Sequence, residues 1–225
     1  MQDSQTTMSE KLNTIRAGVL GSNDGILTVV GVLFSVGAAT TNQFTILIAW
    51  LADLMACALS MASGEYASVS SQADAEKVVV ALEQDRIQVN PNSVQQDIYN
   101  FYHEQGLSET TADKIANELM RKNPLATILK VKYDVSLGHY VGPWSAAFSS
   151  LFCAALGGFL PLIAMYIAPV KWQFLATIGA TVIAVALTGL LSARLGNGFP
   201  KRAIIRNIII GIITITIHYG IGKLF

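Results

Sequence analysis

Five long apolar stretches constrain this chain more than any other feature. They run over residues 17–39, 44–66, 146–167, 172–193 and 203–224. A helix that crosses a bilayer needs about 20 largely apolar residues, because a backbone in lipid must satisfy its own hydrogen bonds. The composition agrees, since 13% of the residues are charged against about 25% in an average soluble domain. The sequence therefore predicts an all-α membrane protein with five transmembrane helices.

The positions of Lys and Arg predict the orientation of these helices. Of the 15 basic residues, two precede the first span, seven lie between the second and third, and four lie from Arg194 to Arg206, around the turn between the fourth and fifth. The other two, Lys171 and Lys223, fall on the opposite side. Because loops rich in Lys and Arg stay in the cytosol, we expect the N-terminus and the long loop to be cytoplasmic. The formal net charge is zero, so no basic surplus indicates a nucleic-acid partner.

The long loop over residues 70–143 has a different composition from the rest of the chain. It mixes charged and apolar residues and contains no stretch that could span a membrane. Helix patterns cover residues 72–87, 93–105, 108–122 and 125–135, with stops at Asn90-Pro91, Gly106 and Asn123-Pro124. We therefore predict a folded helical insertion in the cytosol, which divides the chain into residues 1–69, 70–143 and 144–225.

Three carboxylates, Asp24, Asp53 and Glu65, fall within the first two predicted spans. A charged residue near the centre of a membrane helix costs at least about 2.5–3.5 kcal/mol on insertion scales, so such residues are rare where no ion or proton pathway needs them. We interpret Asp24 and Asp53 as functional for this reason. Glu65 is also open to a second interpretation, because a carboxylate near the cytoplasmic end can extend into the interface.

Four residues of the second span recur at intervals of four, and so they share one face of a helix: Asp53, Cys57, Met61 and Glu65. Carboxylates supply hard oxygen ligands, and a thioether favours transition metals over Mg²⁺ or Ca²⁺. This face therefore suits a borderline divalent ion such as Fe(II) or Mn(II). Ordinary packing is the alternative for Met61.

The first span is unusually rich in glycine. Gly21 and Gly25 have the GxxxG spacing that lets two membrane helices approach closely. The partner is either another helix of the same chain or the same helix of a second copy, and the spacing does not distinguish them.

Other chemical signals are weak. His218 in the fifth span is either a proton relay or a hydrogen-bonded residue at the membrane interface. No P-loop, dinucleotide-binding or nucleophile motif is present. We therefore predict no enzyme activity and no cofactor.

Two segments resemble the vacuolar iron transporter family. They are residues 16–28, RAGVLGSNDGILT, and residues 52–72, ADLMACALSMASGEYASVSSQ. The resemblance covers nearly the whole chain, including the five spans and an insertion after the second. It implies a homodimer with a pathway between the protomers, which moves Fe(II) or Mn(II) out of the cytosol in exchange for protons. The metal ion is then the substrate of an antiporter.

The resemblance also implies which residues bind metal in the membrane. Asp24, Asp53 and Met61 match residues of the family's metal pathway. Glu65 belongs to the Gly-Glu-Tyr form of its second-span motif. Asp53, Met61 and Glu65 also belong to the stripe inferred from spacing.

In the insertion, the resemblance implies that Glu83, Asp97 and Asp134 are metal ligands. The match is partial, because the first insertion helix is less acidic than in the family, and Lys130-Val131 stand where some members have paired methionines. The insertion is therefore either a metal-binding domain or mainly a dimerising or docking module.

Location and rival functions complete the expectations. The compact chain, with no recognisable targeting peptide, favours a bacterial plasma membrane, and a vacuolar membrane if the host is eukaryotic. Two other functions stay open. One is a transporter of another cargo whose acids only relay protons, and the other is a membrane anchor whose insertion binds a partner protein.

Overall fold

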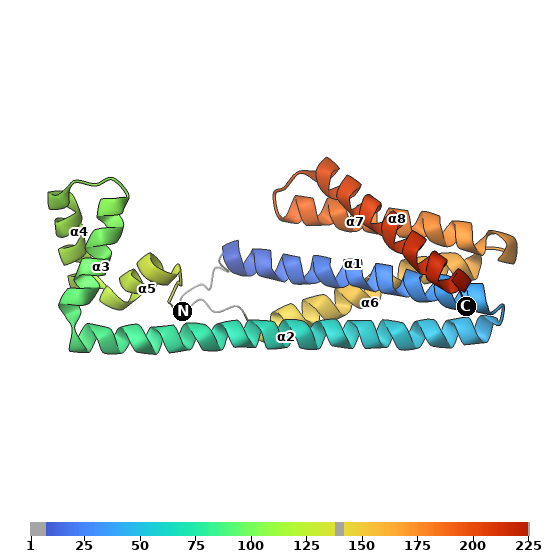
Figure 1. The fold of residues 1–225 in the computed structure, drawn as a ribbon, viewed down its shortest axis with the longest axis horizontal. Coiled ribbons are helices and arrows are strands. Elements are labelled where there is room, and N and C mark those ends of the chain that lie inside the picture. Colours follow the sequence, from blue (N-terminus) through green and yellow to red (C-terminus); the bar gives the residue numbers. More distant parts are fainter. Residues whose placement is uncertain (1–7, 138–141, 225) are drawn as a thin grey trace, which may run out of the picture. The chain divides into compact units, whose positions relative to one another are not determined.

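A computed structural model describes residues 8–137 and 142–224 of the chain. In these ranges the chain forms eight α-helices and one short 3-10 helix, η1, and no strand (Figure 1). The elements are α1 Met8–Ala39, α2 Gln43–Val89, α3 Pro91–Glu104, α4 Glu109–Lys122, α5 Pro124–Tyr133, α6 Pro143–Ile167, η1 Val170–Trp172, α7 Gln173–Leu195 and α8 Pro200–Leu224. The chain divides into two compact units, residues 1–69 with 141–225, and residues 70–140. We call the first the membrane unit and the second the insertion.

Five helices are long and apolar enough to cross a membrane. These segments are Lys11–Ala39, Gln43–Val89, Pro143–Ile167, Val170–Leu195 and Pro200–Ile221. Large apolar side chains stay exposed on the helices, such as Leu156 on α6 and Leu187 on α7, as expected where lipid and not water surrounds the protein. The prediction of an all-α protein with five transmembrane helices is confirmed.

Helix α2 is longer than the sequence predicted. We expected a span over residues 44–66 and a separate helix over 72–87, but α2 continues without a break from Gln43 to Val89. No Pro or Gly lies between residues 67 and 89, so nothing in the sequence ends the helix there. It ends as expected at Asn90, whose side chain accepts a hydrogen bond from the Ser93 amide and so caps α3.

The glycines of α1 pack against α6 of the same chain. A Cβ atom at Gly21 would lie 2.5 Å from the Ser150 carbonyl oxygen, and one at Gly25 would lie 2.1 Å from the Ala154 carbonyl oxygen. From the other side, a Cβ atom at Gly157 would lie 2.5 Å from the Ser22 carbonyl oxygen. Only glycine allows backbones this close. Of the two partners left open for the GxxxG spacing, the structure therefore uses the one within the chain.

The insertion has its own apolar core. Val94 and Ile98, one turn apart on α3, are fully buried against Ala116 of α4 and Ile128 of α5. Ile87, near the end of α2, packs on the same cluster. This core fixes the end of α2, α3 and α5 relative to one another, and so positions the polar residues that these three helices carry.

Candidate functional site

The polar site of the membrane unit lies where α1 faces α2. The Cys57 thiol of α2 donates a hydrogen bond to Oδ2 of Asp24 on α1, with 3.6 Å between sulfur and oxygen. Asp53, one turn before Cys57, interacts electrostatically with Asp24. The structure therefore brings together two predicted site residues from different helices, Asp24 and Asp53, with Cys57 beside them.

The predicted stripe on α2 faces the interior of the membrane unit. Cys57 and Glu65 are buried, and Asp53 and Met61 are half-buried. Leu59, on the opposite face of the same turns, is exposed. Spacing at intervals of four residues thus identified the face of α2 that turns inward.

No Lys or Arg forms an ion pair with Asp24 or Asp53 among the side chains that the structure describes, and of the basic residues His218 lies within electrostatic range of Asp53. Neither residue takes part in any of the ion pairs found there. Oδ2 of Asp53 is buried and accepts no hydrogen bond. A buried carboxylate oxygen without a donor is costly, and a cation between the two carboxylates would remove this cost.

The ligand set around these carboxylates is incomplete in a single chain. Among residues 11–137 and 142–221, whose side chains the structure describes, no three His, Cys, Asp or Glu side chains are grouped closely enough to hold a metal ion. The Asp24–Asp53 pair therefore provides a few strong ligands and leaves most of an ion's coordination positions to water or to further groups.

Glu65 lies in different surroundings. Its side chain is buried, and Oε2 lies 3.5 Å from Nη2 of Arg16, whose side chain is 57% exposed. The contact is an ion pair without hydrogen-bond geometry, because Oε2 has no hydrogen-bond partner. We did not predict Arg16 as this partner. The sequence spacing was consistent with this pair. Arg16 precedes Asp24 by eight residues and Glu65 follows Cys57 by eight, so antiparallel helices that join Asp24 to Cys57 also bring Arg16 near Glu65.

His218 of α8 also reaches this region. Its imidazole packs on Gly31 of α1, where a Cβ atom would lie 2.6 Å from Cε1 of the ring. It interacts electrostatically with Asp53, and its carbonyl oxygen accepts a hydrogen bond from the Ser35 hydroxyl. His218 thus lies within electrostatic range of Asp53, and both roles considered for it stay predictions.

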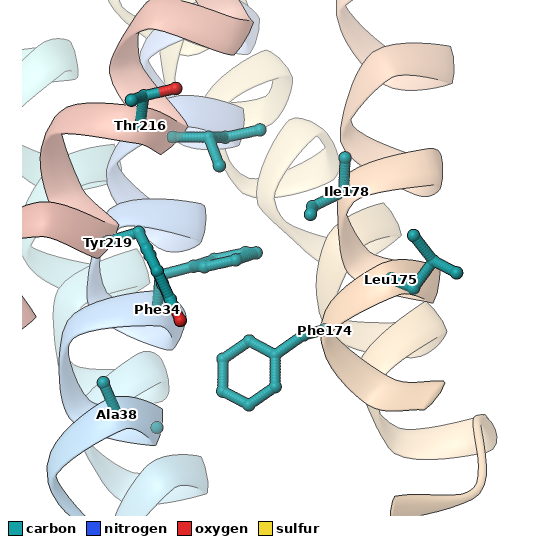
Figure 2. Close-up of a pocket in the computed structure, with 9 residues that line it drawn as sticks. Phe34, Ala38, Phe174, Leu175, Ile178, Thr216 and Tyr219 are labelled. Carbon is teal, nitrogen blue, oxygen red and sulfur yellow. The ribbon is translucent and has the colours of Figure 1, made fainter. Parts of the chain in front are cut away.

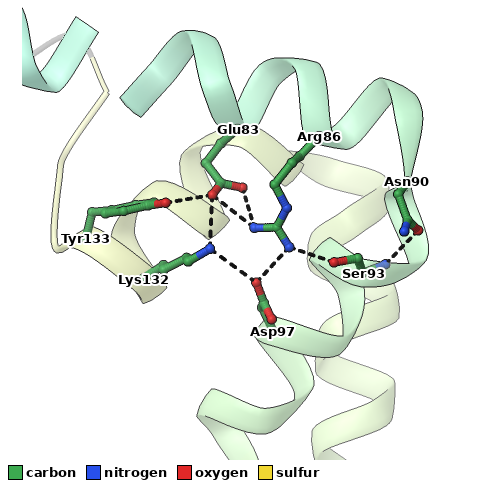
Figure 3. Close-up of polar contacts among 7 residues, drawn as sticks. All are labelled: Glu83, Arg86, Asn90, Ser93, Asp97, Lys132 and Tyr133. Carbon is green, nitrogen blue, oxygen red and sulfur yellow. Dashed lines mark hydrogen bonds and ion pairs between the residues drawn. The ribbon is translucent and has the colours of Figure 1, made fainter. Parts of the chain in front are cut away.

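In the insertion, Arg86 joins two of the predicted metal ligands, Glu83 and Asp97 (Figure 3). It donates to both oxygens of Glu83, at 3.0 and 2.9 Å, and to Oδ2 of Asp97 at 2.9 Å. Lys132 donates to Oε1 of Glu83 at 3.3 Å and lies 3.7 Å from Oδ2 of Asp97. The Tyr133 hydroxyl donates to Oε1 of Glu83 at 2.9 Å.

These bonds set the charge state of Glu83, which is fully buried. Burial by itself raises the pKa of Glu83, but hydrogen bonds from Tyr133, Arg86 and Lys132 outweigh it and hold this pKa below its ordinary range. The bond to Asp97 raises the pKa of Arg86. Glu83 is therefore an anion that protein cations compensate. Arg86 stands three residues after it on one helix face, a signal that the sequence carried.

Asp134 does not join Glu83 and Asp97. It ends α5 in the left-handed conformation, with φ of 55°. Its side chain is exposed and forms an ion pair with Lys130. The assignment of Glu83, Asp97 and Asp134 to metal binding stays a prediction.

An apolar pocket opens between α1, α7 and α8 (Figure 2). Its volume is about 650 Å³. The Phe34 ring meets the Phe174 ring edge-on, with 5.3 Å between centroids. The lining residues include no carboxylate, thiol, thioether or imidazole. The pocket therefore offers none of the side chains that bind transition metals.

Comparison with known proteins agrees with this geometry. The model of the VIT family matches residues 15–223. The chain is 32% identical over 211 residues to the vacuolar iron transporter of Acanthamoeba castellanii, covering 93% of this chain and 78% of that protein. It is 26% identical over 214 residues to vacuolar iron transporter 1 of Oryza sativa subsp. japonica, covering 93% and 84%. It is 26% identical over 226 residues to vacuolar iron transporter homolog 4 of Arabidopsis thaliana, covering 99% and 90%.

The names of these relatives describe transporters and not enzymes, in agreement with the non-enzymatic interpretation of the sequence. The family match includes α1 with Asp24, α2 with Asp53, the insertion and the three C-terminal membrane helices. The chain therefore belongs to the VIT family.

Proposed function

We propose that this protein moves Fe(II) or Mn(II) out of the cytosol, in exchange for protons, through the Asp24–Asp53 site. The observation that carries the proposal is the pair of half-buried carboxylates between α1 and α2, which no described Lys or Arg pairs with. The names of the relatives support iron as a cargo. The soft sulfur atoms of Cys57 and Met61 favour a transition metal over Mg²⁺.

The stripe on α2 provides successive ligands for a moving ion. Glu65, Met61 and Asp53 follow one another along the helix, with roughly 6 Å between positions four residues apart. A hydrated ion would meet Glu65 first, lose water to Met61 and Asp53, and pass Asp24. An incomplete ligand set suits this function, since an ion must leave each site as well as enter it.

Protons can use the same carboxylates. An arriving metal ion displaces protons from its ligands, and a departing ion leaves two carboxylates that repel each other and so take up protons. Metal and protons therefore occupy the Asp24–Asp53 site alternately. His218, within electrostatic range of Asp53, is placed to exchange a proton with this site.

We further propose a homodimer with a cytoplasmic N-terminus and a cytoplasmic insertion. The exposed apolar face of α2, with Met55 and Leu59, is available to a second copy. A pathway between the protomers would give each ion ligands from two chains. The bacterial plasma membrane is the proposed location, and the vacuolar membrane if the host is eukaryotic.

Proteoliposomes test this function. Metal entry is followed with a metal-sensitive dye, and proton movement with a pH-sensitive dye. We expect Asp53→Ala and Asp24→Asn each to lower the rate of metal entry by at least about tenfold, which corresponds to roughly 1.4 kcal/mol. Met61→Ala should lower it less. Asp74→Asn is the matched control, because Asp74 lies on the same helix, is exposed and pairs with Lys77. Unchanged metal entry in both Asp53→Ala and Met61→Ala would refute the pathway.

The same assay separates the two rival functions. A proton relay for another cargo would show proton flux that does not depend on metal. A membrane anchor would show no flux, and its function would be lost on deletion of residues 93–132 and not on substitution of Asp53.

A further inference from the structure

The polar cluster of the insertion contains two carboxylates and two protein cations. Glu83 and Asp97 carry the negative charges, and Arg86 and Lys132 carry the positive ones. The guanidinium of Arg86 lies between the carboxylates, with Nη1 bonded to Glu83 and Nη2 bonded to Asp97 (Figure 3). The net charge of these four residues is zero.

The atoms around the guanidinium form an oxygen-rich shell. Besides the two carboxylates, the Ser93 hydroxyl lies 2.7 Å from Nη2 of Arg86, and the Tyr133 hydroxyl shares Glu83 with it. Oxygen ligands of this kind, with two carboxylates among them, are those that a hard divalent ion such as Mn(II) takes. The cation at the centre of this shell is the guanidinium of Arg86, a side chain of the protein itself.

We propose that Arg86 and Lys132 take the place of a divalent metal ion between Glu83 and Asp97. The insertion then folds around its own cations, and a metal site exists there only when these cations are removed. This disagrees with the assignment of Glu83 and Asp97 as metal ligands that family resemblance implies. It does not rest on the proposed transport function.

The physical reason is competition for the same oxygen atoms. Glu83 is fully buried, and each of its oxygens already accepts at least one hydrogen bond. An entering divalent ion would have to displace Arg86, or else add two positive charges to a neutral cluster. The displaced guanidinium would lose Glu83, Asp97 and Ser93 together. Binding of metal beside Arg86 is therefore unfavourable.

Hydrogen–deuterium exchange of the full chain in detergent tests the proposal, read from peptides that cover α3 and α5. In the wild-type protein, we expect the amides of α3 and α5 to exchange at the same rate in the presence of a chelator and in the presence of Mn(II). In R86M/K132M, the buried Glu83 and the half-buried Asp97 lose their counterions, and without divalent ions the exchange of α3 should accelerate about a hundredfold or more. Added Mn(II) should restore most of the protection, because it fills the vacated position.

R121M/K122M is the control for lost charge. It removes two exposed cations at the end of α4, of which Lys122 forms only an exposed pair with Glu118. Exchange of α3 should not change in this variant.

Three results would overturn the proposal. They are slowing of α3 exchange about tenfold by Mn(II) in the wild type, exchange of R86M/K132M at the wild-type rate, and failure of Mn(II) to protect that variant. Because the readout is local to the insertion, these results are independent of whether the protein transports metal.

Discussion

The acidic residues of this protein fall into two kinds, which differ in the charges around their side chains. Asp24 and Asp53 are half-buried between membrane helices and pair with no Lys or Arg among the described residues. Glu83 and Asp97 are bonded to Arg86 and Lys132. The first pair can accept a mobile cation, whereas the second pair already holds fixed ones. The same residue type thus serves two purposes, according to the charges around it.

Glu83 makes the stability of the insertion depend on pH. Its pKa in the folded protein lies below the ordinary value of about 4.3. Between these two values the unfolded insertion binds more protons than the folded one, so stability is complete above the ordinary pKa and falls as pH decreases through the lower one. We expect α3 exchange, corrected for the intrinsic effect of pH, to accelerate below about pH 4. Glu83→Gln should flatten this dependence, and an unchanged profile in that variant would assign the effect to other carboxylates.

Helices of the membrane unit are held together by close backbone contact as much as by large apolar side chains. Helix α1 touches α6 through glycines on both helices. Lipid offers little hydrophobic drive for two helices to associate, so packing distance decides how strongly they attract. Close contact between α1 and α6 also fixes the position of Asp24, which lies beside Gly25 on α1.

Gly25→Ala should separate α1 from α6. The added Cβ atom would lie 2.1 Å from the Ala154 carbonyl oxygen, and overpacking of this kind costs about 1–3 kcal/mol or more. We expect a lower melting temperature in detergent and slower metal transport. Gly64→Ala is the matched control, because no atom lies within 4 Å of its added Cβ, and the helix propensity of Ala is higher. Equal melting temperatures for the two variants would show that the contact between α1 and α6 is unimportant.

The protein as a whole combines five membrane helices with a charged insertion in one chain. An odd number of crossings places the two ends of the chain on opposite sides of the membrane. The basic residues concentrate at the N-terminal end of α1, in the insertion, and at the adjoining ends of α7 and α8. These observations support the cytoplasmic orientation that we propose for the N-terminus and the insertion.

Labelling of introduced cysteines checks this orientation. In cells, a membrane-impermeant maleimide should label Lys171→Cys from outside and Arg121→Cys only after the membrane is permeabilised. Both positions are exposed, and the native Cys57 and Cys153 lie in membrane helices, so each labelling signal reports one loop. Labelling of Arg121→Cys in intact cells would show that the insertion lies outside the cytosol, and the proposed direction of transport would then be wrong.

Much of this fold could be predicted from the sequence, because hydropathy and helix stops act locally. The five spans need only runs of apolar residues, and the helices of the insertion end at Asn90-Pro91, Gly106 and Asn123-Pro124. The inward face of α2 was also predictable, since residues four apart share a helix face. The continuity of α2 was missed because we assumed that the change from apolar to charged residues marks the end of a helix. It changes only the surroundings of the helix.

Contacts between distant residues could not be predicted in this way, because they depend on how helices pack. Pairing of Glu65 with Arg16 required the antiparallel register of α1 and α2. Lys132 and Tyr133 reach Glu83 from 49 and 50 residues away, through the fold of the insertion. The sequence alone therefore determined which helices form and which residues carry charge. The packing of those helices determined which carboxylates pair with a protein cation, because compensation by a cation depends on distance in space.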